Sequence, residues 1–429
     1  MPSLRILMIS ALEVWALSGQ GGAPSLYRTL EGYSRRGHQV DFISSSIGAN
    51  HHFRAPKQQP PNIHGVRFHL FDLPSLSEMR LPVPAILRKA DQKMRFATLF
   101  PMMAARAAER LFREQDFDLL YGYEVHGVLA QRRVRGKHQL PLVTRFQGTV
   151  MAPYLRRPHS LARKYEEVLA LKTPADLYVM TDDGTQGDEV LQRLNPRSAG
   201  KVCFWRNGLD MNAVRPPEEG EVAAARESLG LNEDDFVLVT ASRLARWKRV
   251  DRAVDAVGLL RKQGIAARLL IVGDGEEYTN LQEQTRNLGL QDLVIFVGAV
   301  PQAEVQKYLW ASDVFLSVNE LSNVGNPLLE AMVAGRCVLT LDEGDTRDLV
   351  RDGETGILLS SGEPDVIARA LETLARDSTL RRRLGLSAQR LAERSFWSWE
   401  QRMDAEVDAV EALVEASGPR GLRPRSLDD

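Results

Sequence analysis

Two cations in the second half of the 429-residue chain have the types and spacing to bind a diphosphate. Arg243 follows the apolar run Val237–Ala241, which predicts a strand, and Lys248 comes five residues after Arg243. Arginine offers a planar set of donors and lysine a mobile charge, and both suit phosphate oxygens. Charged loops are common on protein surfaces, so the residues alone are explained equally well as two solvated loop cations.

A second candidate is a polar loop that leads into a predicted helix start at Asn326–Pro327. Proline is well placed in a first helical turn. We therefore expect the backbone N–H groups of Val324, Gly325 and Asn326 to face an anion. Glu330, one turn inside the helix, could accept two hydroxyls of a ribose. An acid near a helix start is also favoured by the helix dipole alone, so both interpretations stay open.

The first half contributes weaker candidates. Gly21 and Gly22 lie in a glycine-rich loop after the first apolar run, where backbone can approach a ligand closely. His126 follows the apolar run Leu119–Tyr121, and ligands of parallel sheets bind beyond the carboxyl ends of strands. A packing or surface histidine is the alternative for His126.

Several nucleotide and metal motifs are missing from the sequence. Gly273-Asp274-Gly275 follows a predicted strand, but the third glycine of a dinucleotide fingerprint is replaced by Tyr278. The sequence has no phosphate-binding G-x-x-x-x-G-K-[ST] loop, and no H-E-x-x-H or C-x-x-C metal motif. We expect neither a metal site nor a cofactor.

Short apolar runs alternate with helical patterns along the whole chain, which predicts parallel sheets. The segment Met211–Glu221, with two prolines and three acids, predicts a linker and hinge. We expect one Rossmann-like domain at 1–212 and another at 213–394, facing a central cleft that binds the ligand. A helix at 395–415, anchored by Trp397 and Trp399, is expected to return to the first domain; the alternative is that it only caps the second. The tail 416–429 is expected to be disordered. The expected strands are Leu4–Ser10, Val40–Ser44, Leu119–Tyr121, Leu142–Phe146, Leu177–Thr181, Val202–Trp205, Phe236–Ala241, Ala267–Val272, Val294–Val297, Val314–Val318, Arg336–Leu341 and Gly356–Leu359.

Charge is unevenly distributed along the chain. The net charge is −1, which gives no reason to expect nucleic acid, but residues 1–212 carry 29 basic and 19 acidic residues against 26 and 37 in the remainder. A basic first half suggests an anionic partner. The basic stretch Leu81–Glu114 could lie on an anionic membrane, or could be a solvated helical face. The distant cysteines Cys203 and Cys337 favour a cytoplasmic protein, with the inner membrane face as a further possibility.

Together these residues resemble a family-4 glycosyltransferase of the GT-B fold over about residues 4–415. The resemblance depends on an ordered set of motifs. In chain order they are Gly21-Gly22, Asn207-Gly208-Leu209-Asp210, Ser242-Arg243-Leu244 with Lys248, Leu269–Gly275, Phe296–Val300, Gly325 with Leu329–Met332 and Gly335, and Asp352–Gly356.

The resemblance implies transfer of a sugar, with retained anomeric configuration, from a nucleotide diphosphate sugar. UDP is the favoured nucleotide and GDP the next. The acceptor would be a glycan, a lipid-linked molecule or a small molecule. Arg243 and Lys248 would neutralise the leaving diphosphate, Glu330 would hold the ribose, and backbone at Val297–Val300 would contact the base. Gly21 and Gly22 would approach the donor phosphate. Such a transferase needs no metal or cofactor.

The chain departs from the family pattern at two places. Ser322 stands where the family has the first of two glutamates separated by seven residues. Asn323 and Asn326 could replace some of its hydrogen bonds, and Glu320 lies two residues upstream. In the first half, His126 matches the family's histidine region only loosely, because tyrosines occupy the family's two histidine positions. A donor-binding pseudoenzyme that scaffolds a pathway and a GT-B nucleotide-sugar epimerase therefore remain alternatives.

Overall fold

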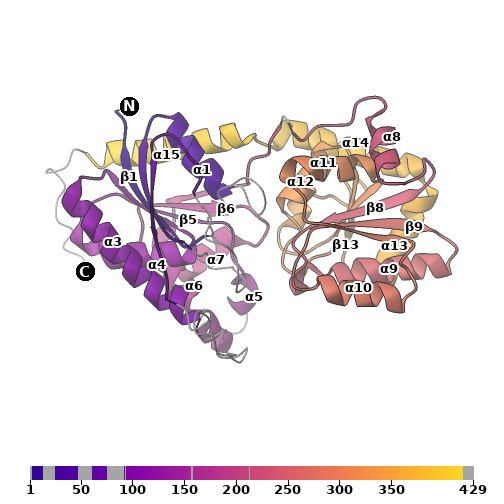
Figure 1. The fold of residues 1–429 in the computed structure, drawn as a ribbon, viewed down its shortest axis with the longest axis horizontal. Coiled ribbons are helices and arrows are strands. Elements are labelled where there is room, and N and C mark those ends of the chain that lie inside the picture. Colours follow the sequence, from indigo (N-terminus) through magenta and orange to yellow (C-terminus); the bar gives the residue numbers. More distant parts are fainter. Residues whose placement is uncertain are drawn as a thin grey trace. The chain divides into compact units, whose positions relative to one another are not determined.

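The computed structural model describes residues 2–12, 25–46, 60–74, 91, 93–155, 158–211 and 213–418. The chain folds into two compact units. The first contains the described residues up to Asp182, the segment Gly187–Arg206 and the residues from Trp399 onward. The second contains Asp183–Gln186 and Asn207–Ser398. Each unit is built around one parallel sheet, as the alternating pattern predicts (Figure 1).

The first unit has a seven-stranded sheet with strand order β3-β2-β1-β4-β5-β6-β7. Both faces are covered, which explains why most of its strands read as continuous apolar runs. Only β3 was not expected from the sequence, because its residues are half-exposed at the edge of the sheet. The strands are β1 (Arg5–Ser10), β2 (Gln39–Ser45), β3 (Val66–Phe71), β4 (Leu119–Tyr123), β5 (Leu142–Phe146), β6 (Leu177–Thr181) and β7 (Val202–Trp205).

Helices pack on both faces of this sheet (Figure 1). α1 and α15 cover one face, and α3 covers the other, where it packs against α4. The helical elements are α1 (Ser25–Arg35), η3 (Arg95–Leu99), α3 (Phe100–Glu114), α4 (Glu124–Val134), η4 (Arg135–Lys137), α5 (Ala152–Leu155), η5 (Pro158–Lys164), α6 (Tyr165–Leu171), α7 (Gly187–Leu194), η6 (Pro196–Ser198) and α15 (Trp399–Ala416).

The C-terminal helix α15 is held to the first sheet by a buried ionic cluster. Glu406 accepts hydrogen bonds from Arg145 at 2.9 Å, from Arg402 at 3.1 Å and from the hydroxyl of Tyr121 at 2.7 Å. The side chains of Glu406, Arg145 and Arg402 are fully buried. Burial raises the pKa of Glu406, but the two guanidinium groups outweigh it and hold the pKa below its ordinary value. Trp399 at the helix start is buried as well.

The second unit has a six-stranded sheet with strand order β10-β9-β8-β11-β12-β13. α9, α10 and α13 cover one face, and α8, α11, α12 and α14 cover the other. The strands are β8 (Phe236–Ala241), β9 (Ala267–Val272), β10 (Val294–Gly298), β11 (Val314–Ser317), β12 (Cys337–Leu341) and β13 (Ile357–Leu359). The helical elements are α8 (Glu221–Ser228), η7 (Arg246–Lys248), α9 (Val250–Lys262), α10 (Tyr278–Asn287), α11 (Gln302–Ala311), α12 (Asn326–Val333), η8 (Thr346–Asp348), α13 (Pro364–Arg376) and α14 (Ser378–Ser395).

The segment expected to be a linker, Met211–Glu221, lies within the second unit. Arg215 pairs with Glu221 at 2.6 Å, and its guanidinium lies 4.8 Å from the ring centre of Trp310. The backbone oxygen of Arg215 also accepts hydrogen bonds from Gln306 and Trp310. These contacts fix Arg215 on the second unit, and the chain passes from the first unit to the second at Arg206 and Asn207.

Candidate active site

Most of the second-unit candidates follow the carboxyl ends of neighbouring strands. Val300 comes after β10, Arg243 and Lys248 after β8, and the segment 319–330 after β11. Because β10, β9, β8 and β11 are adjacent and parallel, these loops emerge at one edge of the sheet, where α/β proteins bind ligands. Val300 is half-buried there and packs against the apolar core.

The loop that carries Arg243 packs against the loop after β9. β8 and β9 pair residue for residue up to Ala241 and Val272, so the two loops start level. Leu244 donates its N–H to Asp274 at 2.9 Å. Gly273 has φ 131°, and a Cβ on it would clash with the backbone oxygen of Ser242. The glycines that resemble a dinucleotide motif therefore serve close packing of two loops.

Arg243 and Lys248 lie close enough to repel each other. Arg243 is exposed, whereas Lys248 is half-buried, with its Nζ 4.0 Å from the ring centre of Trp247. Burial lowers the pKa of Lys248 to about 8; Asp183 opposes this shift and Arg243 adds to it. Two neighbouring cations, one with a depressed pKa, form a site whose electrostatic energy an anion would lower.

The β11–α12 loop is held by its own side chains. Ser322 donates its hydroxyl to the backbone oxygen of Asp183 at 2.5 Å and accepts the N–H of Val324 at 3.0 Å. Asn323 is 2% exposed; its Oδ1 accepts from Ser317 at 2.9 Å and its Nδ2 donates to Leu341 at 3.2 Å. The side chain of Asn323 is thus committed to the loop, contrary to its expected role as a replacement donor.

The expected cradle of three N–H groups is reduced by this arrangement. α12 begins at Asn326 with a proline in its first turn, as expected. However, Val324 donates to Ser322, and Gly325 donates to the backbone oxygen of Asn323 at 3.0 Å. Of these three N–H groups, only that of Asn326 has no hydrogen-bond partner among the described residues. The side-chain oxygen of Asn326 accepts from Asn207 at 3.3 Å.

Glu330 is 2% exposed in the first turns of α12. Burial raises its pKa to about 8; a hydrogen bond from Gln302 opposes the shift, and the charge of Asp210 adds to it. Gln302 and Asp210 were not among the residues expected at the site. Asp210 had a signal, since it ends the Asn207–Asp210 motif, but Gln302 had none.

Glu320 does not replace the missing family glutamate. It forms ion pairs with Arg249 at 2.5 Å and with Arg252 at 3.7 Å. Its backbone N–H donates to Trp247 at 3.1 Å, which ties the β11–α12 loop to the loop of Lys248. Neither Ser322 nor Glu320 therefore supplies a carboxylate in place of that glutamate.

In the first unit, His126 lies in the first turn of α4. Its Nε2 is 3.4 Å from an oxygen of Glu166, and its ring centre is 5.8 Å from that of Phe96. Glu124 is the first residue of α4 and has φ 62°; its carboxylate accepts a hydrogen bond from the N–H of Gln147 at 2.6 Å. Neither Glu124 nor Gln147 was among the expected site residues. Gly21 and Gly22 lie outside the described residues.

Comparison with known proteins gives a family match within the second unit. Residues 221–391 match the family model described as Glycosyl transferases group 1. The D-inositol 3-phosphate glycosyltransferase of Streptomyces avermitilis is 28% identical over 268 residues, covering 60% of this chain and 56% of the relative. The chain spans about half the length of the curated relatives it matches.

Two solved structures resemble the whole chain. Sucrose-phosphate synthase from Thermosynechococcus elongatus has 18% identity and a TM-score of 0.74, covering 96% of this chain and 100% of that one. The Anabaena HepE protein, solved with UDP-glucose, has 20% identity and a TM-score of 0.66, covering 95% and 100%. The expected GT-B fold class is thereby confirmed.

Proposed function

We propose that this protein is a retaining hexosyltransferase that uses a nucleotide diphosphate sugar. The pairing of Arg243 with Lys248 at the carboxyl edge of the second sheet carries the proposal. A diphosphate would relieve the repulsion of the two cations and return the pKa of Lys248 toward its ordinary range. The UDP-glucose bound by the HepE protein supports UDP as the first nucleotide to test, with GDP next.

The proposed reaction balances charge without a metal ion or cofactor. The bond from the anomeric carbon to the diphosphate oxygen breaks, and negative charge builds on the leaving nucleotide diphosphate. Arg243, Lys248 and the N–H of Asn326 stabilise this charge. The acceptor oxygen bonds to the same face of the sugar, so configuration is retained, and the acceptor proton passes to a phosphate oxygen. Glu330 binds the ribose hydroxyls.

The acceptor side of the proposal belongs to the first unit. His126 there is paired with Glu166 and is a candidate for orienting an acceptor hydroxyl. The D-inositol 3-phosphate glycosyltransferase of Streptomyces avermitilis is named for a phosphorylated acceptor. The net positive charge of residues 1–212 suits such a group. We place the reaction in the cytoplasm, with a glycan, lipid-linked molecule or small molecule as acceptor.

A panel of UDP-, GDP-, ADP- and dTDP-sugars tests the proposal. The full chain is incubated with each donor and a glycan or lipid extract, and released nucleotide diphosphate is measured. We expect release from one donor, reduced at least about a hundredfold in Arg243→Ala and Lys248→Ala. Arg246→Ala, which removes an exposed cation of the same loop, is the matched control and should retain activity. If no donor binds to the wild type, the proposal is wrong.

The second candidate function is a donor-binding scaffold without turnover. It is favoured by Ser322, whose hydroxyl is committed to hydrogen bonds with Asp183 and Val324 and whose side chain carries no charge. Saturable binding of one nucleotide sugar, with no release of nucleotide diphosphate in the presence of any acceptor extract, would support the scaffold. Turnover would exclude it.

A further inference from the structure

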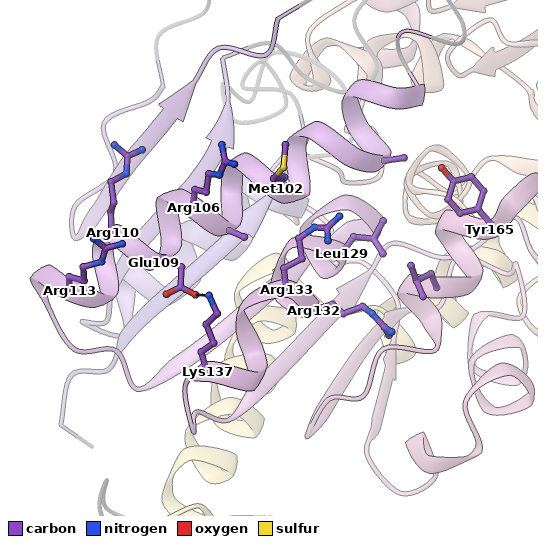
Figure 2. Close-up of a pocket in the computed structure, with 13 residues that line it drawn as sticks. Met102, Arg106, Glu109, Arg110, Arg113, Leu129, Arg132, Arg133, Lys137 and Tyr165 are labelled. Carbon is purple, nitrogen blue, oxygen red and sulfur yellow. Dashed lines mark ion pairs between the residues drawn. The ribbon is translucent and has the colours of Figure 1, made fainter. Parts of the chain in front are cut away.

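A basic groove lies on the first unit, where α3, α4 and α6 line a pocket of about 1050 Å³ (Figure 2). Six cations and one acid, Glu109, line it. Glu109 is already paired with Lys137 at 2.9 Å. The cations are Arg106, Arg110 and Arg113 on α3, Arg132 and Arg133 on α4, and Lys137 on η4.

The five arginines of the groove are exposed, and none forms an ion pair with any residue that the structure describes. Arg106, Arg110 and Arg113 follow one face of α3 at intervals of four and three residues, which places neighbours about 5–6 Å apart. Figure 2 shows the α3 arginines along one side of the groove, with Arg132 and Arg133 on α4. The arrangement suits several anionic groups in a row, since each guanidinium can bind a carboxylate, sulfate or phosphate through two parallel bonds.

Apolar side chains lie between and beside these cations. Met102 and Leu129 line the groove, and Tyr165 and Leu169 on α6 are 47% and 38% exposed. At that end Lys93, which pairs with Glu166 at 3.5 Å, places its Nζ 4.7 Å from the ring centre of Tyr165. Exposed apolar surface within a basic groove favours a ligand that has both anionic groups and C–H faces.

We propose that this groove binds an acidic oligosaccharide chain. Sugar rings offer C–H faces to the apolar surface, while their carboxylate, sulfate or phosphate groups meet the arginines. A flat membrane would leave a hollow of this volume unfilled. A nucleic acid strand would find one aromatic ring in the groove, where sequence-independent binders present several. The idea that this oligosaccharide is an acceptor substrate rests on the proposed function. The idea that the groove binds it does not.

Binding of defined oligosaccharides to the full-length protein tests the inference by calorimetry at about 50 and 200 mM salt. The probes are a heparin hexasaccharide, a galacturonic acid hexamer and a neutral cellohexaose. We expect the acidic hexamers to bind at least about tenfold more tightly than cellohexaose, with weaker binding at higher salt. Arg106→Gln combined with Arg110→Gln should reduce affinity for the acidic hexamers about tenfold or more.

The matched control is Arg193→Gln combined with Arg197→Gln, two exposed arginines of the same unit outside the groove. It should keep wild-type affinity, and unchanged thermal unfolding shows that both double variants fold. Leu169→Ala should weaken binding of the hexamers but not of inorganic polyphosphate, which has no C–H faces. Equal affinity for cellohexaose, or equal losses in both double variants, overturns the inference.

The same variants distinguish oligosaccharide binding from binding of other anionic partners. They also distinguish a failure of this inference from a failure of the proposed function. If phosphatidylglycerol vesicles bind through Arg106 and Arg110 while the hexamers do not, the groove is a membrane surface and the inference is wrong. Equal binding of single-stranded DNA would make it a general polyanion site and also overturn the inference. If the hexamers bind but no donor is hydrolysed, the groove stands and the proposed function fails. If a donor is hydrolysed but the hexamers do not bind, the proposed function stands and the inference about the groove is wrong.

Discussion

At the scale of single residues, two buried or half-buried groups of the second unit titrate near neutral pH. Lys248 has its pKa lowered to about 8, and Glu330 has its pKa raised to about 8, in both cases mainly by burial. Neither shift can be read from the sequence, because the same residue types in exposed loops keep ordinary values.

The first prediction concerns the pH dependence of nucleotide binding. Below about pH 8 Lys248 carries its proton, and above it the charge is lost. Affinity for UDP should therefore fall between about pH 7 and pH 9.5, measured by calorimetric titration. Lys248→Arg stays charged throughout and should flatten the dependence. Because Glu330 titrates in the same range, the comparison is repeated in Glu330→Gln. A flat wild-type profile would contradict a role for Lys248.

The second prediction concerns stability and Glu330. Its folded pKa lies above the unfolded value of 4.5, so its contribution is fully present below pH 4.5 and is lost as pH rises through about 8. Glu330→Gln removes this dependence. The variant should match the wild type near pH 4.5 and exceed it at about pH 9.5 by on the order of 4 kcal/mol in urea unfolding. Parallel profiles for the two proteins would show that Glu330 is not the titrating group.

At the scale of elements, loops after adjacent strands hold one another in place. The loop after β9 supports the loop of Arg243, and the β11–α12 loop is fastened to both Trp247 and Asp183. The Asn207–Asp210 motif reaches α12 through the hydrogen bond from Asn207 to Asn326. Hydrogen bonds thus join motifs that are far apart in the chain into one network that includes the loop of Arg243 and Lys248.

The third prediction tests the contact between the loop after β9 and the loop of Arg243 by substituting Gly273. Gly273→Ala would force the backbone of Ser242 aside, because the added Cβ has no space. We expect a loss of roughly 3 kcal/mol or more in unfolding free energy and a parallel loss of UDP affinity. Gly264→Ala also has positive φ, 79°, but no atom within 4 Å of the added Cβ, so it should cost about 1 kcal/mol and leave UDP affinity unchanged. Equal effects would refute the packing role of Gly273.

At the scale of the whole molecule, the last helix belongs to the first unit, although the segment Asn207–Ser398 of the second unit lies between them in the sequence. α15 packs on α1, where Met403 lies against Gly32, and its Glu406 compensates two buried arginines of the first unit. Stability of the first unit therefore depends on a segment at the far end of the chain. No helix among the described residues is both long and apolar enough to cross a membrane.

The fourth prediction separates the two units. Glu406→Gln leaves Arg145 and Arg402 buried with no carboxylate and should destabilise the first unit by about 3–5 kcal/mol. UDP affinity of the second unit should not change. Asp408→Asn breaks an exposed ion pair between the same helix and Arg36 and should cost at most about 1 kcal/mol. Hydrogen exchange resolves the units; an equal loss of protection in both would contradict their independence.

Local patterns in the sequence were sufficient for most of the architecture. Twelve of the strands were expected because buried parallel strands are continuous apolar runs, and the start of α12 followed from a proline in a first helical turn. Arg243, Lys248 and Glu330 were proposed as site residues because they follow predicted strands, and they do lie after β8 and β11. Edge strand β3 was missed because its half-exposed residues carry no such run.

The sequence by itself determined which segments form strands and helices and which residues follow strand ends, because hydrophobic period and turn chemistry are local properties. Tertiary structure alone decided how those residues are used. The side chains of Ser322 and Asn323 form hydrogen bonds that hold their loop and are not free for a ligand. Glu320 forms ion pairs with Arg249 and Arg252. Gln302 donates a hydrogen bond to Glu330 from another helix. Hydrogen bonds and desolvation depend on neighbours brought together only by folding, and those neighbours set both the pKa values and the groups left available for chemistry.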